Sequence, residues 1–229
     1  MHALDLAVSG SQLVAGPAGP MEVIVDAPRG PMHDGIAIVA HPQPLLGGHA
    51  LHKVPQLLAR ALSDAGWRVA RPNFRGVGGS AGVHDAGIGE AEDVVALHDA
   101  LRGAHPGARI ALVGFSFGAF VQARVARALE DRGRAAWRVC LAGMPSGPVQ
   151  DGRVFDPPQG LANALVVHGE RDERVALAAV LDWARPQGQP VVVVPGADHF
   201  FTGRLPILRG LVLSHLAICV PAAFPPPPP

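Results

Sequence analysis

The sequence predicts an α/β fold with a single doubly wound, mostly parallel sheet flanked by helices. Short apolar runs typical of buried strands alternate along the chain with longer segments whose apolar residues recur every three or four positions. No internal repeat breaks this alternation, and right-handed crossovers then place the strands in one sheet. The chain has 229 residues, and we assign residues 1–220 to one domain and residues 221–229 to a proline-rich tail.

The first two strands are expected to form an antiparallel edge of the sheet. A weakly alternating run, a turn-rich segment at residues 16–20 and a strand-like segment at 21–26 precede the continuous apolar run 36–40. This run is typical of a central parallel strand that is covered on both faces. It leads into residues 41–48, where two prolines and two glycines predict a shaped loop without a helix.

The remaining elements continue the alternation of strand and helix. Further strands are expected at residues 67–70, 110–113, 138–143, 164–169 and 190–194. Helices are expected at residues 51–65, 90–104, 117–129, 175–184 and 205–219. The glycine-rich segment 75–81 contains a formal match to a dinucleotide-binding fingerprint, but glycines continue through residue 89 before helical spacing resumes. Because that fingerprint must open a helix at once, we interpret the segment as a loop.

The composition excludes several classes of function. Nineteen basic and nineteen acidic side chains cancel, which leaves no basic footprint for nucleic acid and no polybasic patch for anionic membranes. The two cysteines, Cys140 and Cys219, lie in apolar runs without a Cys-x-x-Cys partner, so we interpret them as small buried hydrophobes. We therefore expect no metal and no cofactor.

The sequence also predicts a cytoplasmic protein with no membrane partner. Its start lacks the cationic and long apolar regions of a signal peptide. The most apolar segment, residues 205–224, is interrupted by Arg209, His215 and Pro221, and it is therefore not a membrane span.

The segment Gly-Phe-Ser-Phe-Gly at residues 114–118 is the strongest functional signal in the chain. It lies where a strand-like run gives way to helical spacing, which is the context of a nucleophile elbow. In so sharp a turn, Gly114 and Gly118 approach their neighbours too closely for a Cβ atom. The N–H of Phe117 would lie at a helix N-terminus, where it can stabilise developing negative charge. Because glycine is abundant in this chain, the motif could occur by chance. A catalytic role for Ser116 therefore depends on whether the chain offers partner residues for it.

Two candidate partners follow later strands in the expected order. A serine needs a base within hydrogen-bond reach, and the base needs an orienting acid. Asp172 lies just beyond the strand at residues 164–169, and His199 lies just beyond the strand at 190–194. Their order, Ser, acid and His, is the one expected on a sheet of this type.

Three neighbouring residues are alternatives for these roles. Glu170 also follows the first of these strands, but it lies closer to the strand end and is expected to reach sideways. Asp198 is adjacent to His199, so the two side chains diverge. His168 lies inside the strand end and is expected to be packed. We therefore favour the triad Ser116, Asp172 and His199.

With these motifs, the chain resembles the α/β-hydrolase superfamily over nearly its whole length. It is most similar to small lidless bacterial serine hydrolases, through His-Pro-Gln-Pro at residues 41–44, Asn-Phe-Arg-Gly-Val-Gly-Gly-Ser at 73–80 and the elbow at 114–118. The connection at residues 144–163 is too short for a helical cap, so we expect an α/β-hydrolase fold with no large lid and an open site.

The resemblance implies the same triad and adds an oxyanion hole made by two backbone N–H groups. These are the N–H groups of Phe117 and Gln43, since the prolines beside Gln43 have none to give. Gln43 stands where many relatives have histidine, and because the donor is the backbone, this exchange leaves the donor in place.

These observations predict a serine hydrolase that acts on a carboxylic ester or thioester of a small-molecule acyl substrate through an acyl-enzyme. Its activity should rise with pH as the histidine base loses its proton, near the ordinary imidazole value of about 6.5. An acyltransferase or peptidase with the same triad, and a non-catalytic binding protein on the same fold, are the alternatives.

Overall fold

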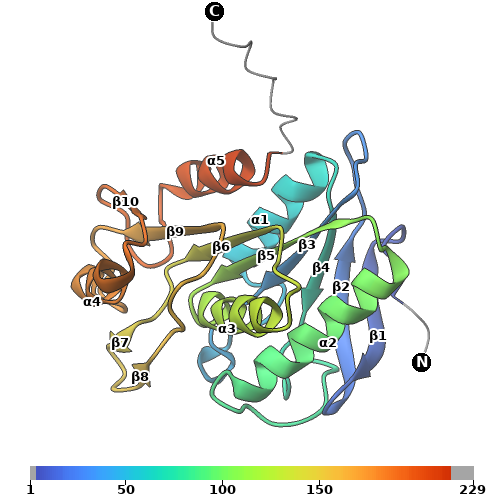
Figure 1. Cartoon of the computed structure of the whole chain (residues 1–229), viewed down its shortest axis with the longest axis horizontal. Helices are drawn as coiled ribbons and strands as arrows, with labels where there is room; N and C mark the ends of the chain where they lie inside the picture. The colour runs from blue at the N-terminus through green and yellow to red at the C-terminus, as the bar shows by residue number, and fades with distance from the viewer. Residues whose placement is uncertain (1–3, 218–229) are drawn as a thin grey trace, which may run out of the picture.

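The computed structural model describes residues 4–217 and contains one eight-stranded sheet with helices on both faces (Figure 1). The strand order is β1-β2-β4-β3-β5-β6-β9-β10. The strands of this sheet are β1 (Gly10–Gly16), β2 (Gly19–Asp26), β3 (Gly35–Ala40), β4 (Arg68–Pro72), β5 (Arg109–Phe115), β6 (Arg138–Ala142), β9 (Ala164–Gly169) and β10 (Val191–Val194). The helices are α1 (Lys53–Asp64), α2 (Ile88–Ala104), α3 (Phe117–Asp131), α4 (Leu177–Ala184) and α5 (Leu205–His215).

The pairing of the strands confirms the predicted fold class. Strand β1 pairs with β2, and β2 with β4, in antiparallel register. All other neighbouring strands of the sheet run parallel. The antiparallel edge is therefore where the sequence predicts it, and the carboxyl ends of the parallel strands meet at one edge, the usual place for a ligand site.

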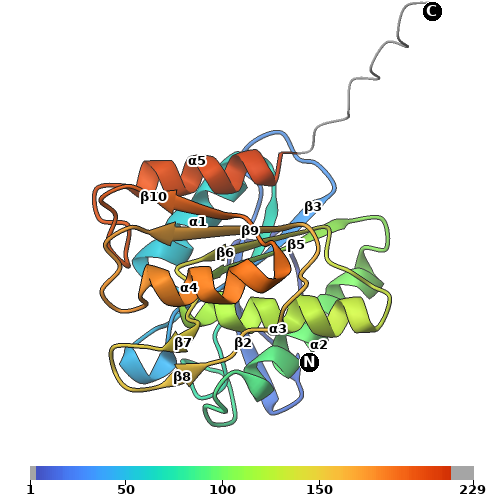
Figure 2. The same cartoon turned by 60° about the vertical axis from the view of Figure 1, so that its left-hand side comes forward.

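Strand β3 explains why the sheet has a helical layer on each face. All six of its residues are buried, so neither face can be left to solvent. Ile36 and Ile38 belong to the core shared with α2, α3 and α4, whereas Ala37 and Val39 belong to the core shared with α1 and α5 (Figure 2). The alternation follows from the two-residue period of a strand.

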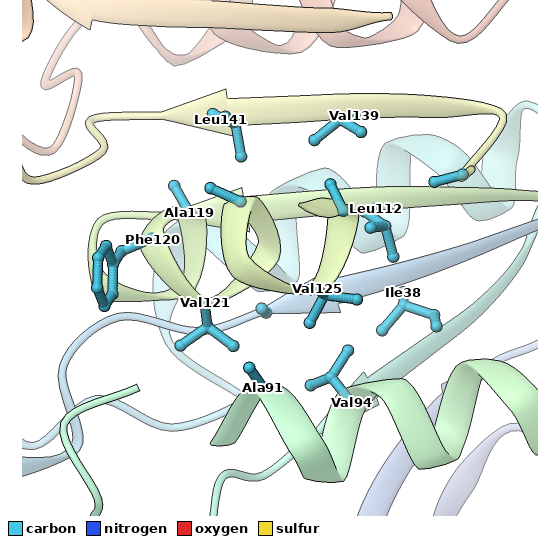
Figure 3. Close-up of a cluster of buried hydrophobic side chains, with 14 of the residues drawn as sticks. Ile38, Ala91, Val94, Leu112, Ala119, Phe120, Val121, Val125, Val139 and Leu141 are labelled. Carbon is cyan, nitrogen blue, oxygen red and sulfur yellow. The ribbon is translucent and has the colours of Figure 1, made fainter. Parts of the chain in front are cut away.

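The core beneath α3 fixes that helix against the centre of the sheet. Ile38 of β3 and Leu112 of β5 lie close to Val125 of α3, and Val94 of α2 lies next to Val125 (Figure 3). Each of these side chains is fully buried, and each such burial contributes roughly 1.5–3 kcal/mol. The start of α3, which carries the elbow, is thereby held at the edge of the sheet.

The connection between β6 and β9 carries no large lid, as predicted. It contains only a short hairpin, made by β7 (Gly147–Pro148) and β8 (Val154–Phe155). The sequence does not predict this hairpin, because strands of two residues are too short to show a two-residue period.

Two local expectations are corrected by the structure. The prediction of no helix within residues 41–48 is wrong by one turn, since a 3₁₀ helix runs from Pro44 to Leu46. Proline fits there because the first helical residue has no intrahelical partner for its N–H. The last helix, expected to reach residue 219, ends at His215.

Several expectations fall on the end of the chain. The predictions that Cys219 is a buried hydrophobe and that the last residues form a proline-rich tail concern residues outside the described part of the chain.

Cys140 is buried, as expected, and burial raises the pKa of its thiol. Within residues 4–217, no helix is both long enough and apolar enough to cross a membrane.

Candidate active site

Ser116 lies on a sharp turn between β5 and α3 and has a backbone conformation that is rare for a residue with a side chain. Its φ is 55° and its ψ is −125°. A Cβ atom on Gly114 would lie 2.4 Å from the carbonyl oxygen of Gly118, and one on Gly118 would lie 2.5 Å from the carbonyl oxygen of Ala40. Both distances are shorter than any real contact of a Cβ atom, which confirms the predicted steric reason for the two glycines.

Three predicted site residues meet at the carboxyl edge of the sheet. His199 Nε2 lies 2.9 Å from Ser116 Oγ, and His199 Nδ1 lies 2.7 Å from Asp172 Oδ2. Asp172 follows β9 and His199 follows β10, so three loops that are distant in sequence bring these groups together. These two hydrogen bonds join the serine hydroxyl to the aspartate carboxylate through the histidine ring, and we call this arrangement the relay.

Backbone groups hold the Asp172 carboxylate in a fixed orientation. Its Oδ1 accepts hydrogen bonds from the N–H groups of Arg174 at 2.9 Å and Val175 at 2.8 Å. Its other oxygen is thereby left facing His199. The Asp172 side chain is out of contact with solvent, so these bonds act in a water-poor environment where they are strong.

The rejected alternatives have structural roles of their own. Glu170 Oε2 accepts a hydrogen bond from the N–H of Gly196 at 2.7 Å, which ties its loop to that of His199. Asp198 Oδ1 accepts one from the N–H of Thr202 at 2.8 Å. Neither carboxylate makes a hydrogen bond to the His199 ring within the described part of the chain, which agrees with the choice of Asp172 as its partner.

His168 is packed, as predicted, but it also lies beside the triad. Its Nε2 is 2.9 Å from the carbonyl oxygen of Val175, which can only accept, so this nitrogen carries the proton. The same nitrogen lies 3.4 Å from Asp172 Oδ2. Burial lowers the pKa of His168, which favours the neutral ring, and its N–H is taken by the carbonyl of Val175.

The loop after β3 places Gln43 in the lining of the site. The carbonyl oxygen of Gln43 accepts hydrogen bonds from the N–H groups of Leu46 at 3.1 Å and Gly48 at 2.9 Å, which close the loop. Within residues 4–217, neither the N–H of Gln43 nor that of Phe117 donates to a protein acceptor. Gln43 and Phe117 both line the cleft, so their N–H groups are the candidate donors to an oxygen atom bound there.

The buried ring of His41 packs under this loop and holds it by hydrogen bonds. It is fully buried, its Nδ1 lies 2.7 Å from the carbonyl oxygen of Pro42, and its Nε2 accepts a hydrogen bond from the N–H of Phe74 at 3.0 Å. Burial lowers the pKa of His41 to about 3. The ring is therefore neutral near pH 7, with its proton on Nδ1, and fixes the peptide that precedes Gln43.

A cleft of about 560 Å³ opens directly onto these groups. Its lining includes the site residues Gln43, Ser116, Phe117 and His199. The lining also includes residues that the sequence analysis does not identify, on the loop after β3, on the hairpin and on the loops after β9 and β10: Leu46, His52, Val149, Arg153, Phe155, Arg174 and Phe200. Their sequence neighbourhood marks only the loops, because a strand-end pattern does not predict which loop side chains turn inward.

Aromatic rings surround the histidine of the relay. The ring centroid of His199 lies 5.3 Å from that of Phe115 and 5.2 Å from that of Phe200. The ring centroid of His52 lies 6.0 Å from that of Phe200, and burial lowers the pKa of His52. Within residues 4–217, no group of three or more His, Cys, Asp or Glu side chains is arranged to hold a metal ion.

The chain matches known proteins over this fold. The family model of the α/β-hydrolase fold matches residues 45–146. An α/β serine hydrolase homologue from Coxiella burnetii is 37% identical, with a TM-score of 0.79 over 91% of this chain and 97% of that one. An α/β serine hydrolase without a lid from Xanthomonas campestris is also 37% identical, with a TM-score of 0.78 over 90% of this chain and 93% of that one.

A curated relative matches over a shorter stretch. An uncharacterised protein of Rickettsia prowazekii is 47% identical over 87 residues, which are 38% of this chain. The match spans 37% of the length of that relative. From the two solved structures and the family model together, the chain belongs to the α/β-hydrolase superfamily and is similar to its lidless serine hydrolases.

Proposed function

We propose that this protein is a serine hydrolase that cleaves a carboxylic ester or thioester of a small acyl substrate through a covalent acyl-enzyme. The observation that carries the proposal is the pair of hydrogen bonds that join Ser116, His199 and Asp172, at 2.9 and 2.7 Å. A serine hydroxyl is a weak nucleophile at neutral pH, and a histidine base at this distance is what activates it.

The first half of the reaction forms the acyl-enzyme. Ser116 Oγ attacks the carbonyl carbon while its proton passes to His199 Nε2. The N–H groups of Phe117 and Gln43 donate to the oxygen that becomes negative, and Asp172 stabilises the imidazolium. Each of these N–H donors contributes about 10²–10³ in rate in enzymes of this type. Collapse of the tetrahedral intermediate expels the alcohol or thiol, which leaves with the proton of His199.

The second half returns the enzyme to its starting state. Water attacks the acyl carbon and gives its proton to the same nitrogen of His199. Ser116 Oγ then leaves as the second tetrahedral intermediate collapses, and it regains its proton from the imidazolium. The carboxylic acid is released, and the balance is one water consumed for each ester or thioester bond broken.

The shape of the cleft supports a small or protruding acyl group. The connection between β6 and β9 places only the β7–β8 hairpin above the site, so a long lipid chain finds little apolar surface to bury. A cleft of about 560 Å³ is within the range of small-molecule sites.

The proposal is tested by covalent labelling followed by kinetics. We expect a fluorophosphonate probe to label Ser116 and not Ser214, an exposed serine of α5. The Ser116→Ala variant should lose about 10⁵–10⁶-fold in kcat toward 4-nitrophenyl acetate, whereas Ser214→Ala should match the wild-type protein. Retained turnover in Ser116→Ala would refute the assignment.

Substrate and acceptor panels separate the remaining alternatives. Hydrolysis of esters and thioesters but not of peptide substrates supports the proposal, and preferential cleavage of peptides would favour a peptidase. A product that carries an added alcohol in place of water would identify an acyltransferase. Failure of the probe to label Ser116 would favour a binding protein without catalysis.

A further inference from the structure

One wall of the cleft carries an excess of positive charge. Among the residues that line the cleft, the charged ones are Asp151 and Arg153 of the β7–β8 hairpin and Arg174 of the loop after β9. The lining therefore holds two guanidinium groups and only one carboxylate. Burial lowers the pKa of His52, also in the lining, so this histidine adds no charge near neutral pH.

Arg153 is only partly satisfied by its aspartate. Its Nε lies 2.9 Å from Asp151 Oδ1, and its Nη2 contacts Asp151 Oδ2. The side-chain hydrogen bond from Arg153 is the largest cause that lowers the pKa of Asp151. The third nitrogen of the guanidinium, Nη1, has no hydrogen-bond partner among the described residues, but it is out of contact with solvent, so a substrate in the cleft cannot reach it.

Arg174 makes no ion pair within residues 4–217, although its charge is among the causes that lower the pKa of Asp151. No carboxylate oxygen of this part of the chain lies within 4.0 Å of its guanidinium, and its side chain donates no hydrogen bond. An arginine side chain has five N–H donors, and here all of them are free. Arg174 is exposed, so these donors face solvent and can be reached by a ligand in the cleft.

The position of Arg174 is nevertheless fixed. The backbone N–H of Arg174 donates to Asp172 Oδ1 at 2.9 Å, and its backbone carbonyl oxygen accepts a hydrogen bond from the N–H of Gln150 at 3.0 Å. Its guanidinium carbon lies 5.1 Å from the ring centroid of Phe200, within the range of a cation–π contact. Phe200 also packs on His199, so the free cation lies close to the reacting groups.

We propose that Arg174 forms a subsite for a carboxylate on the substrate, so that the enzyme prefers esters with a negative charge. The proposal rests on the hydrolase function proposed above. A guanidinium presents paired N–H donors that match the two oxygens of a carboxylate. The carboxylate could belong to the acyl half or to the leaving group, and both halves reach this cleft.

The test compares matched pairs of charged and neutral esters. For the acyl half, the pair is the 4-nitrophenyl monoester of glutaric acid and 4-nitrophenyl pentanoate. For the leaving group, the pair is 4-acetoxybenzoate and 4-tolyl acetate. The quantity measured is the ratio of kcat/KM for the charged ester to kcat/KM for the neutral ester. Comparing this ratio between variants cancels differences in intrinsic reactivity and any effect of a variant on the triad.

Three variants give distinct expected results. Arg174→Gln should lower the ratio about fivefold in one of the two pairs, since the cation is partly solvated and its field is screened. Asp151→Asn should raise the ratio of that pair, because it removes the competing negative charge. Arg171→Gln, in an exposed arginine of the same loop that does not line the cleft, should leave the ratio unchanged. The preference should also shrink in 1 M NaCl.

The possible failures can be told apart. If the wild-type protein labels at Ser116 and hydrolyses both members of each pair, but Arg174→Gln and Arg171→Gln give the same ratios, the carboxylate subsite is overturned and the hydrolase function stands. A lower ratio in Asp151→Asn would overturn the subsite as well. If the wild-type protein neither labels nor hydrolyses any of these esters, both proposals fall.

Discussion

The two walls of the cleft are built in opposite ways. The elbow wall, made by Gln43, Ser116 and Phe117, lies on buried backbone at the ends of β3 and β5. The hairpin wall, made by residues 149–155, is largely exposed and is held by strands of two residues each. The contrast indicates that the proposed reaction constrains the elbow wall, whereas the hairpin wall can vary with the substrate.

Glycine shows the difference most directly. On the elbow wall, a Cβ on Gly118 would lie 2.5 Å from backbone carbonyl oxygens that are fixed by the sheet. On the hairpin wall, a Cβ on Gly152 would meet no atom within 4 Å. Interiors are close-packed and respond to one added methyl group, whereas exposed loops absorb it.

The largest effect is expected where the relay itself is altered. Asp172→Asn should lower kcat about 10⁴-fold, because an amide no longer favours the histidine tautomer that can accept the serine proton. Glu170→Gln, which keeps an oxygen acceptor for Gly196, is the matched control and should retain most activity. Steady-state kinetics with 4-nitrophenyl acetate measure both. Equal losses in the two variants would contradict the assignment of the acid.

A methyl group on the elbow wall should unfold or distort it. Gly118→Ala should lower the free energy of unfolding by about 3 kcal/mol or more, because backbone must move to admit the Cβ atom. Gly103→Ala in α2, where a Cβ meets nothing within 4 Å, should instead raise stability by roughly 0.5–1 kcal/mol. Urea unfolding checks both values, and similar stabilities of the two variants would contradict the close approach at the elbow.

The buried histidine of the elbow wall should make stability depend on pH. Burial lowers the pKa of His41 to about 3, whereas a histidine in an unfolded chain titrates near about 6.5. Between these values the unfolded state binds a proton that the folded state excludes. The contribution of His41 is therefore complete above about pH 6.5 and is lost as the pH falls toward 3, with a slope approaching about 1.4 kcal/mol per pH unit.

Urea unfolding at pH 7, 6 and 5 measures this slope. His41→Asn keeps a side-chain N–H for the carbonyl of Pro42 but cannot titrate, so the slope of the variant should be shallower than that of the wild-type protein by the same amount. Parallel slopes for the two proteins would show that His41 does not exclude the proton.

The smallest effect is expected on the hairpin wall. Val154 is 72% exposed and does not line the cleft. Val154→Ala should therefore change the free energy of unfolding by less than about 0.5 kcal/mol and leave kcat/KM for 4-nitrophenyl acetate within about twofold. A large loss in either measurement would mean that the hairpin is coupled to the elbow, and the contrast between the walls would fail.

The sequence predicts the elements that have a long apolar period and the residues tied to them. Strand β9 begins and ends where the apolar run does, and the alternation of strand and helix predicts the class of sheet. Ser116, Asp172 and His199 could be predicted because each lies just past the carboxyl end of a strand, which the sheet brings to one edge. Their proximity follows from topology and needs no knowledge of side-chain packing.

The elements that the sequence does not predict are those set by tertiary contact. The β7–β8 hairpin has no period to read, and the turn of 3₁₀ helix at Pro44 is closed by hydrogen bonds to Gln43. The proposed role of Arg174 depends on the lack of an ion-paired carboxylate among the described residues, which only the folded arrangement defines. His168 was predicted as packed, but its contact with Asp172 requires the turn of the loop after β9.

The short hairpin also has a kinetic consequence. Where a helical cap covers a hydrolase, a movement of that cap can limit entry of substrate and exit of product. With a hairpin of two-residue strands in its place, the proposed reaction has no such gate. Turnover should then follow the chemistry of acylation or deacylation, and a lipid–water interface should not accelerate it.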